Sequence, residues 1–410
     1  MTAQTMTGRQ LPEFPLRSVE RRTDAAEEYA RLAAGAPVTE VRLPSGRPAW
    51  LIVGYREVRT ALTDPRFSRN EAVRDPGGHL LAVEAVGTSI LNLDPPAHTR
   101  LRRVAARGFT EARIAALRPR ITELVGELLD DLAQQHPDPV DLCEGFCKVL
   151  PVRVIGEILG VPPADRYRIE KWRDGLDAPI TGTGAPDTSA HTELLEYIDE
   201  LVAERRERPQ DDLLSVLARA GEDGEEEDVL TDREIAALGG TLLVAGFENT
   251  VAQLGLVLRE VLTGPNGPRG LPQDDEALAA EVEELIRRLP IGDYGGTLAR
   301  KATEDVELGG VSIKAGDIVI AAVQAANFDP EAFADPRRHD PVRDTVAHHL
   351  AFGYGVHRCL GAPVARIELQ ESLKALRDRF PGMRLAVPAE ELRFHEAAIN
   401  RRLVSLPVVW

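Results

Sequence analysis

Phe352-Gly353-Tyr354-Gly355-Val356-His357-Arg358-Cys359-Leu360-Gly361 is the stretch that decides the fold of this 410-residue chain. Cys359 follows a glycine-rich loop and stands directly before a segment with helical periodicity, residues 362–380. The N-terminus of a helix offers free backbone N–H groups and a positive partial charge, and both stabilise a thiolate. The glycines let the backbone pass close to a large planar ligand, against which Phe352 can pack. The loop therefore predicts an anionic cysteine beside a flat ligand.

A long apolar helix in the middle of the chain is the second informative feature. Thr231 and Glu234 fit a capping box, and the apolar run 235–262 predicts a central helix that is buried on most sides. Its middle reads Ala245-Gly246-Phe247-Glu248-Asn249-Thr250. A glycine, a carboxylate and an amide inside a buried helix break the local rules, and such positions tend to mark function.

These stretches together resemble the cytochrome P450 family, whose haem-binding loop has the pattern found at residues 352–361. The resemblance implies that Cys359 is the axial thiolate ligand of a haem b iron. It implies that Phe352, Gly353 and Gly361 line the haem. The expected fold is mainly α with small β-sheets, a single domain over residues 1–410, with the haem between the long central helix and the Cys loop with the last major helix.

Four cations resemble the residues with which the family binds the haem propionates. His98 and Arg102 stand four residues apart in the segment 94–102, on one face of an expected helix. Arg300 lies on an expected strand, and His357 lies within the loop itself. Propionate carboxylates near protein require such charge-assisted donors.

Glu284-Leu285-Ile286-Arg287 resembles the family's ExxR helix. With Arg343, from a loop rich in proline and arginine, it implies a Glu–Arg–Arg network that braces the protein under the haem. A buried carboxylate is tolerable when guanidinium groups satisfy it.

The central helix is expected to carry the residues that handle dioxygen and protons. Ala245-Gly246-x-Glu248 matches the family motif, which implies that Gly246 leaves room for dioxygen and that Glu248 relays protons. The family usually has threonine after the acid, whereas this chain has Asn249, with Thr250 one place later. Because one residue turns a helix by about 100°, Thr250 is not expected to replace the missing hydroxyl. We expect the Asn249 NH₂ group to donate toward the oxygen site while its carbonyl orders a water linked to Glu248.

Composition excludes several classes of protein. The net charge of −17 argues against nucleic acid as a partner. The N-terminus lacks the features of a secretory signal, and no run approaches about 18 uninterrupted apolar residues, so we expect a cytoplasmic chain with no membrane span. Cys143 and Cys147 are interpreted as buried core thiols.

The expected activity is a monooxygenase that oxidises a small, natural-product-type molecule. Ferredoxin and ferredoxin reductase would supply electrons from NAD(P)H, because no fused reductase is evident. The docking face is expected to be basic, formed by Arg100, Arg103, Arg107, Arg358 and Arg366. The resemblance implies that the substrate contacts the Ala245 face of the central helix and residues 72–91, 176–192, 289–297 and 397–401. Polar residues there and at their flanks, Asn92, Asp293, Tyr294 and Asn400, favour a partly polar substrate.

Two alternatives remain open. One is an oxidase of the same fold that couples or cross-links its substrates through radicals, for example cyclic dipeptides or peptide-derived metabolites. Asn249 and the glycine-rich segment 291–296 favour it. The other is a non-catalytic haem protein that senses gas, against which Glu248 argues, since a sensor needs no proton relay.

Overall fold

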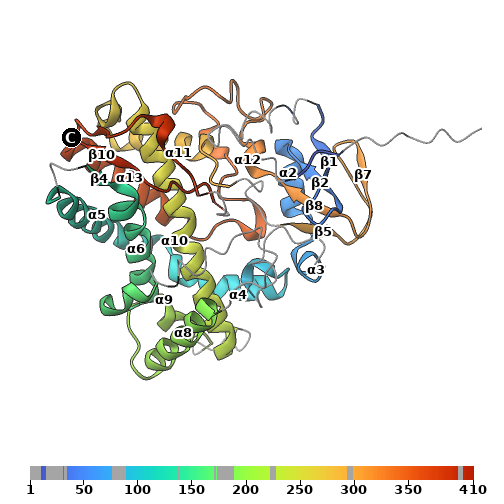
Figure 1. Ribbon diagram of the computed structural model, residues 1–410. Helices are drawn as coiled ribbons and strands as arrows, with labels where there is room; N and C mark the ends of the chain where they lie inside the picture. The colour runs from blue at the N-terminus through green and yellow to red at the C-terminus, as the bar shows by residue number, and fades with distance from the viewer. Residues whose placement is uncertain are drawn as a thin grey trace, which may run out of the picture.

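The computed structural model describes residues 11–14, 31, 35–75, 89–135, 139–169, 172, 189–221, 228–292, 299–395 and 400–410. It is mainly helical with small sheets, as predicted, and one long helix passes through its middle (Figure 1). The α-helices are α2 (Tyr55–Thr63), α3 (Arg69–Val73), α4 (Ala97–Ala106), α5 (Glu111–Ala133), α6 (Val149–Leu159), α8 (Ser189–Glu207), α9 (Leu213–Ala218), α10 (Asp232–Thr263), α11 (Asp275–Arg288), α12 (Val323–Ala326) and α13 (Ala362–Arg379).

Short helical turns link these helices. The 3₁₀ turns include η3 (Ile90–Asn92), η4 (Arg107–Phe109), η6 (Pro163–Asp165), η8 (Gly267–Gly270), η9 (Val346–His348), η10 (Gly355–His357) and η11 (Ala389–Glu391). A π-helical turn, η5, spans Cys143–Cys147. Both of its cysteines are buried in the main core, which confirms their interpretation as core thiols.

The strands form three small sheets in the described residues. They are β1 (Val38–Arg42), β2 (Pro48–Ile52), β3 (Phe67–Ser68), β4 (Val140–Asp141), β5 (Arg300–Ala302), β6 (Val306–Leu308), β7 (Val311–Ile313), β8 (Ile318–Ala321), β9 (Arg384–Leu385) and β10 (Pro407–Val409). The largest sheet has the order β1-β2-β8-β5-β3, and a second has the order β4-β10-β9. Because β3 pairs with β5, Arg69 at the start of α3 is brought beside Arg300.

Helix α10 begins as its sequence predicts. The Thr231 hydroxyl accepts a hydrogen bond from Glu234 N (3.3 Å), while Glu234 Oε2 accepts one from Thr231 N (2.9 Å). In the main core the helix packs mostly against α8 and α6, and also contacts α9, α11 and α13. Among the described residues it is the one helix long and apolar enough to cross a membrane, but 61% of its most apolar window is buried by the rest of the protein. Its apolarity is that of a central core helix.

Candidate functional site

The loop around Cys359 is held by its own backbone. Cys359 N donates to Phe352 O, and Gly353 N donates to Leu350 O, both over 2.8 Å. Gly355 has a φ of +72°, and a Cβ there would lie 2.6 Å from the Leu62 carbonyl oxygen. Only glycine fits this position. A Cβ on Gly361 would meet nothing within 4 Å, so the loop has an open side directly before α13.

Cys359 itself differs from the expectation in one respect. The residue keeps an exposed face, yet the protein surrounding its sulfur raises the pKa of the thiol above its ordinary value by burial. Hydrogen bonds from the N–H groups of Gly361 and Ala362, with the charges of Arg102 and Arg366, oppose that effect without overcoming it. In the protein without metal, burial thus outweighs the helix terminus, and the thiolate predicted at Cys359 stays a prediction that depends on the bound iron. Coordination of a metal would deprotonate the thiol outright.

The four predicted propionate ligands lie close together, and His98 and Arg300 are buried while Arg102 and His357 are half-buried. The rings of His98 and His357 lie 4.2 Å apart between centroids. Burial, together with the nearby charges of His98, Arg300, Arg69 and Arg102, lowers the pKa of His357 to about 3. Arg102 is joined to the loop, since its Nη2 donates to the Arg358 carbonyl. The structure thus brings His98, Arg102, Arg300 and His357 together from three separate segments of the chain.

Sequence reasoning missed Arg69, a fully buried member of this group. Its guanidinium donates to Leu91 O over 3.1 Å, to Asn92 Oδ1 over 2.8 Å and to Ala299 O. Burial lowers the pKa of Arg300 to about 9, and the charge of Arg69 contributes to that shift. The sequence carried no motif for Arg69, because its partners lie far along the chain.

This cationic group fits the carboxylates of a haem. Nδ1 of His98 and Nε2 of His357 are buried, and neither has a hydrogen-bond partner in the described structure. Buried polar atoms without partners are rare and call for an explanation. Two propionates would supply acceptors for these donors and would balance the buried positive charge. The open side at Gly361 and the Cys359 thiol complete a donor set that suits a haem bound through sulfur.

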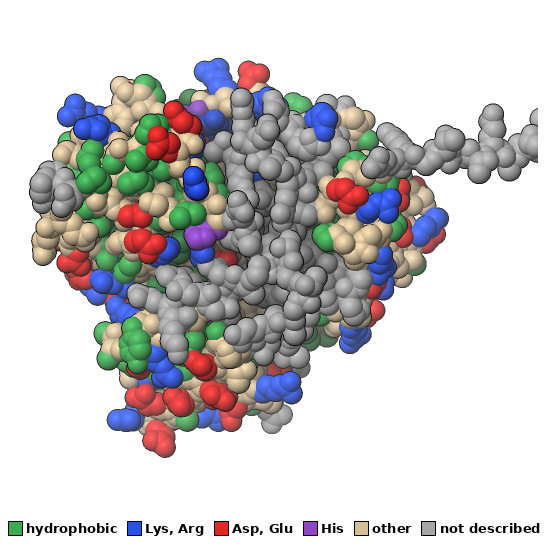
Figure 2. Space-filling view, in the orientation of Figure 1, with side chains coloured by type: hydrophobic (Ala, Val, Ile, Leu, Met, Phe, Trp, Pro, Cys, Tyr) green, Lys and Arg blue, Asp and Glu red, His purple; other side chains and the backbone are tan. Residues whose placement is uncertain are grey.

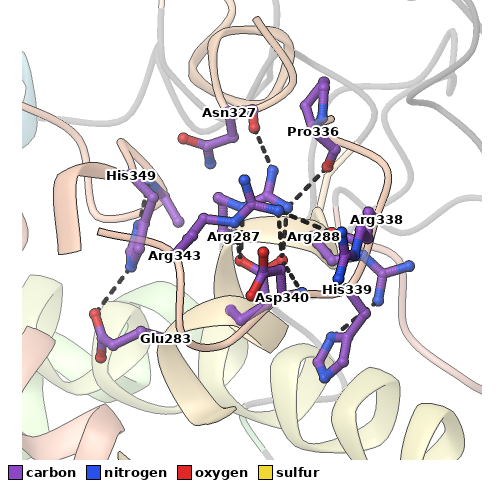
Figure 3. A network of polar contacts seen from close by, with 12 residues as sticks. Glu283, Arg287, Arg288, Asn327, Pro336, Arg338, His339, Asp340, Arg343 and His349 are labelled. Carbon is purple, nitrogen blue, oxygen red and sulfur yellow. Dashed lines mark hydrogen bonds and ion pairs between the residues drawn. The ribbon is translucent and has the colours of Figure 1, made fainter. Parts of the chain in front are cut away.

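The predicted Glu–Arg–Arg network is present. Arg287 donates to both carboxylate oxygens of Glu284 over 2.8 Å, and both side chains are fully buried. Arg343 Nη2 donates to Glu284 Oε1 over 3.3 Å, and Asp340 N donates to the same oxygen over 3.0 Å. Figure 3 shows the two guanidinium groups converging on one point from α11 and from the loop that carries Arg343.

The network ties α11 to the segment that leads into the Cys loop. Arg287 also donates to Asn327 O (2.6 Å) and to Pro336 O (2.8 Å). The side chain of Asn327 in turn accepts from Leu350 N over 2.6 Å. Burial raises the pKa of Glu284, but hydrogen bonds from Arg287 and Asp340 N, with the charge of Arg343, lower it below its ordinary value overall. The carboxylate is therefore ionised, and it is satisfied by its partners.

One face of α10 is exposed at the middle of the helix. Ala245 and Asn249, four residues apart, are both exposed, and Glu248 is half-buried. Thr250 is buried, and its hydroxyl lies 3.4 Å from the Gly246 carbonyl, to which it donates. The buried Thr250 hydroxyl, bonded within its own helix, supports the prediction that it does not replace the missing hydroxyl, which stays a prediction. Gly246 has a packing role, because a Cβ there would lie 2.6 Å from Ile155 Cγ1, so its missing side chain lets α6 pack closely against α10.

Asn249 has a partner that sequence reasoning did not pair with it. Asn400 Nδ2 donates to Asn249 Oδ1 over 3.0 Å. The expected water-ordering carbonyl of Asn249 is thus engaged by a side chain. Both residues lie in segments that were expected to contact the substrate, but their spacing in the sequence did not predict that they contact each other.

Two further expectations require correction. Asn92 is buried and accepts from Arg69, so it braces the fold and does not face a substrate. The basic docking patch is largely compensated by carboxylates. Arg100 pairs with Glu234, Arg103 and Arg107 with the buried Asp228, and Arg366 with Glu283. These ion pairs reduce the net positive charge expected of the patch at four of its five arginines, and docking of ferredoxin there stays a prediction. On the face shown in Figure 2, acidic and basic side chains are interspersed.

Much of the expected substrate-contacting surface lies outside the described residues. This holds for residues 76–88, 176–188, 293–297 and 397–399, and so for Asp293 and Tyr294.

Comparisons with known proteins show which family the chain is similar to. The cytochrome P450 family model matches residues 187–381. Nocardicin C N-oxygenase of Nocardia uniformis subsp. tsuyamanensis is 42% identical over 93% of this chain and 94% of that protein. Mycinamicin IV hydroxylase/epoxidase of Micromonospora griseorubida is 40% identical over 99% of this chain and all of that protein. A solved cytochrome P450 with biaryl coupling reactivity is 36% identical, with a TM-score of 0.85, and the match covers 95% of this chain and 97% of that one.

Proposed function

Because the chain belongs to the cytochrome P450 family of haem–thiolate oxidoreductases, we propose that it oxidises a small natural-product molecule by inserting oxygen. The family implies haem b as the cofactor. The observation that carries the proposal is the cationic group around the two unpartnered histidine nitrogens, placed beside the Cys359 loop. Relatives named as an N-oxygenase and as a hydroxylase/epoxidase support this type of reaction.

Each residue has a role in the proposal. Cys359 would ligate the iron, and His98, Arg102, Arg300 and His357 would bind the propionates. Phe352, Gly353 and Gly361 would line the haem. When bound, the haem supplies the activation of dioxygen, which a thiolate ligand favours. Glu284, Arg287 and Arg343 would hold the loop that presents the thiolate.

The exposed face of α10 would meet the substrate and deliver protons. Ala245 is small enough to leave space at that face, and Glu248 would hold a proton at its carboxylate and pass it toward the reaction. Asn249 would donate from its NH₂ group, because its carbonyl accepts from Asn400.

The partners and the location follow the family pattern. We propose that ferredoxin and ferredoxin reductase supply electrons from NAD(P)H, and that the protein acts in the cytoplasm without nucleic acid or membrane as partners. The whole chain would act as one haem-thiolate domain. Relatives that align over 94% and 100% of their own lengths support this reading.

A second candidate is radical coupling of the substrate without oxygen insertion. Asn249 in place of a hydroxyl, with Thr250 buried, favours it, because a proton relay without that hydroxyl suits a reaction that ends before oxygen transfer. The resemblance to a biaryl-coupling P450 supports it too. The gas-sensor alternative is set aside, because the relatives are named as oxygenases.

The experiment is a screen of natural products for compounds that shift the haem Soret band, followed by turnover with ferredoxin, ferredoxin reductase and NAD(P)H under ¹⁸O₂. A product that carries ¹⁸O supports the first candidate. A dehydrogenated or coupled product without ¹⁸O supports the second. Haem-loaded protein that binds compounds of the screen but turns none of them over would contradict both.

A further inference from the structure

We infer that Asn249 and Asn400 form an amide pair that selects substrates carrying a lactam or a primary carboxamide. This inference rests on the proposed function and deepens it, since it names the substrate class of the same site.

The pair stands on an exposed face in the middle of the central helix. Asn249 and Ala245 are exposed although most of α10 is buried. The same face continues one turn earlier at Thr241, whose hydroxyl lies 3.2 Å from that of Ser89. The exposed part of α10 thus lies between η3 at one end and Asn400 at the other.

The backbone of Asn400 is fixed by its neighbours. Asn400 forms an antiparallel bridge with Gly292, and Arg401 N donates to Ile291 O over 2.6 Å. Arg402 N donates to Asn400 O over 2.8 Å, which closes a tight turn. The side chain of Asn400 is therefore presented from a held backbone, and a rigid polar group costs little ordering on binding a ligand.

A single hydrogen bond between two side-chain amides engages one NH₂ group and one carbonyl oxygen, and it leaves the other NH₂ group and the other carbonyl oxygen available to a ligand. Asn249 keeps its NH₂ group, and Asn400 keeps its carbonyl oxygen. If Asn249 donates and Asn400 accepts instead, one NH₂ group and one carbonyl oxygen are again left for a ligand. A ligand that offers C=O and N–H on one edge, as the cis amide of a lactam or a primary carboxamide does, complements this donor and this acceptor.

The test uses two probes of matched shape, 4-phenylpyrrolidin-2-one and the lactone in which oxygen replaces its N–H. Calorimetry on the haem-loaded protein measures both dissociation constants. We expect the wild type to bind the lactam about two- to tenfold more tightly than the lactone, the range of one net hydrogen bond. Asn400→Ala and Asn249→Ala should each reduce that ratio to near one. Thr241→Val, on the same face of α10, should keep it.

A lactam that binds no more tightly than the lactone, or not at all, contradicts the inference, and so does a preference that survives both asparagine variants. The ferrous carbon monoxide spectrum of the same samples separates this failure from a failure of the proposed function. If the thiolate-type band is present but the lactam is not preferred, only the inference about the amide pair is wrong. If the thiolate-type band is absent, the haem–thiolate assignment is wrong as well.

Discussion

Arg366, on the helix that follows the Cys loop, donates two hydrogen bonds to Glu283 on α11, over 2.6 and 2.8 Å. His349 Nε2 lies 3.0 Å from the same carboxylate, and the Arg366 guanidinium stacks 4.5 Å from the centre of the Phe352 ring. Burial raises the pKa of Glu283, but the bonds from Arg366 and His349 lower it to about 2 overall. Arg366 thus links the Cys loop, through Phe352, to helix α11, and the carboxylate of Glu283 compensates its charge.

Electron transfer from an acidic ferredoxin should depend most on Arg358, which is exposed and has no carboxylate partner among the described residues. We expect Arg358→Ala to slow reduction by about two- to fivefold at low salt, the range of an exposed ion pair. Stopped-flow reduction at several salt concentrations measures this. Arg384→Ala, an exposed arginine on β9, is the control. Equal rates for wild type and Arg358→Ala would remove Arg358 from the docking surface.

Removal of Arg287 should prevent the protein from folding with haem. The substitution Arg287→Ala leaves the Glu284 carboxylate buried with an incomplete set of partners, at a cost of roughly 3–5 kcal/mol. The measurement is the yield of soluble protein and its haem content. Arg288→Ala on the same helix, whose side chain is partly exposed, should cost less than about 1 kcal/mol. Normal haem content in Arg287→Ala would refute the bracing role.

Glu368 makes the stability of the protein depend on pH. It is buried on α13, its Oε2 has no hydrogen-bond partner, and burial raises its pKa from 4.5 to about 8. Between these values the unfolded chain binds fewer protons at this group than the folded one, so this residue lowers stability as pH rises, by up to roughly 1.4 kcal/mol per pH unit. Above pH 8 the penalty is complete, and below pH 4.5 it is absent.

Glu368→Gln should therefore raise Tm at pH 8 and change it little near pH 4.5. Thermal unfolding of both proteins at matched pH values measures the difference, and Glu390→Gln at an exposed position is the control. A gain in Tm that is the same at both pH values would show that Glu368 does not titrate in this way.

Asn249 should control coupling, which is the fraction of consumed NAD(P)H that yields product and not hydrogen peroxide. We compare wild type with Asn249→Thr and Asn249→Ala, and measure product and hydrogen peroxide formed per NAD(P)H consumed. Asn249→Ala removes the donor and should release more peroxide, whereas Asn249→Thr supplies a hydroxyl that both donates and accepts and should favour oxygen insertion. Identical products and coupling in all three proteins would exclude Asn249 from proton delivery.

The sequence predicted the parts of the site that lie in short motifs. The capping box at Thr231, the Cys loop and the Glu284–Arg287 pair each consist of neighbours in sequence, so their geometry follows from local periodicity and turn chemistry. Helix geometry also predicted that Thr250 is turned away from the position of the missing hydroxyl, but its burial was not predicted.

What the sequence did not predict are pairs formed by the fold. Arg69 with Ala299, Asn400 with Asn249, and Asp228 with Arg103 and Arg107 join residues far apart in the chain. The raised pKa of the Cys359 thiol likewise depends on how much protein surrounds the sulfur, which a helix terminus in sequence does not reveal. Charge compensation and desolvation are properties of the packed structure.

The most direct test of the haem–thiolate assignment is the spectrum of the reduced protein with carbon monoxide, for wild type and for Cys359→His. The wild type should show the Soret band at the position that gives the family its name, because the thiolate of Cys359 is the axial ligand. Cys359→His should lose that band. A variant whose band is identical to that of the wild type would contradict the assignment of Cys359 as the ligand.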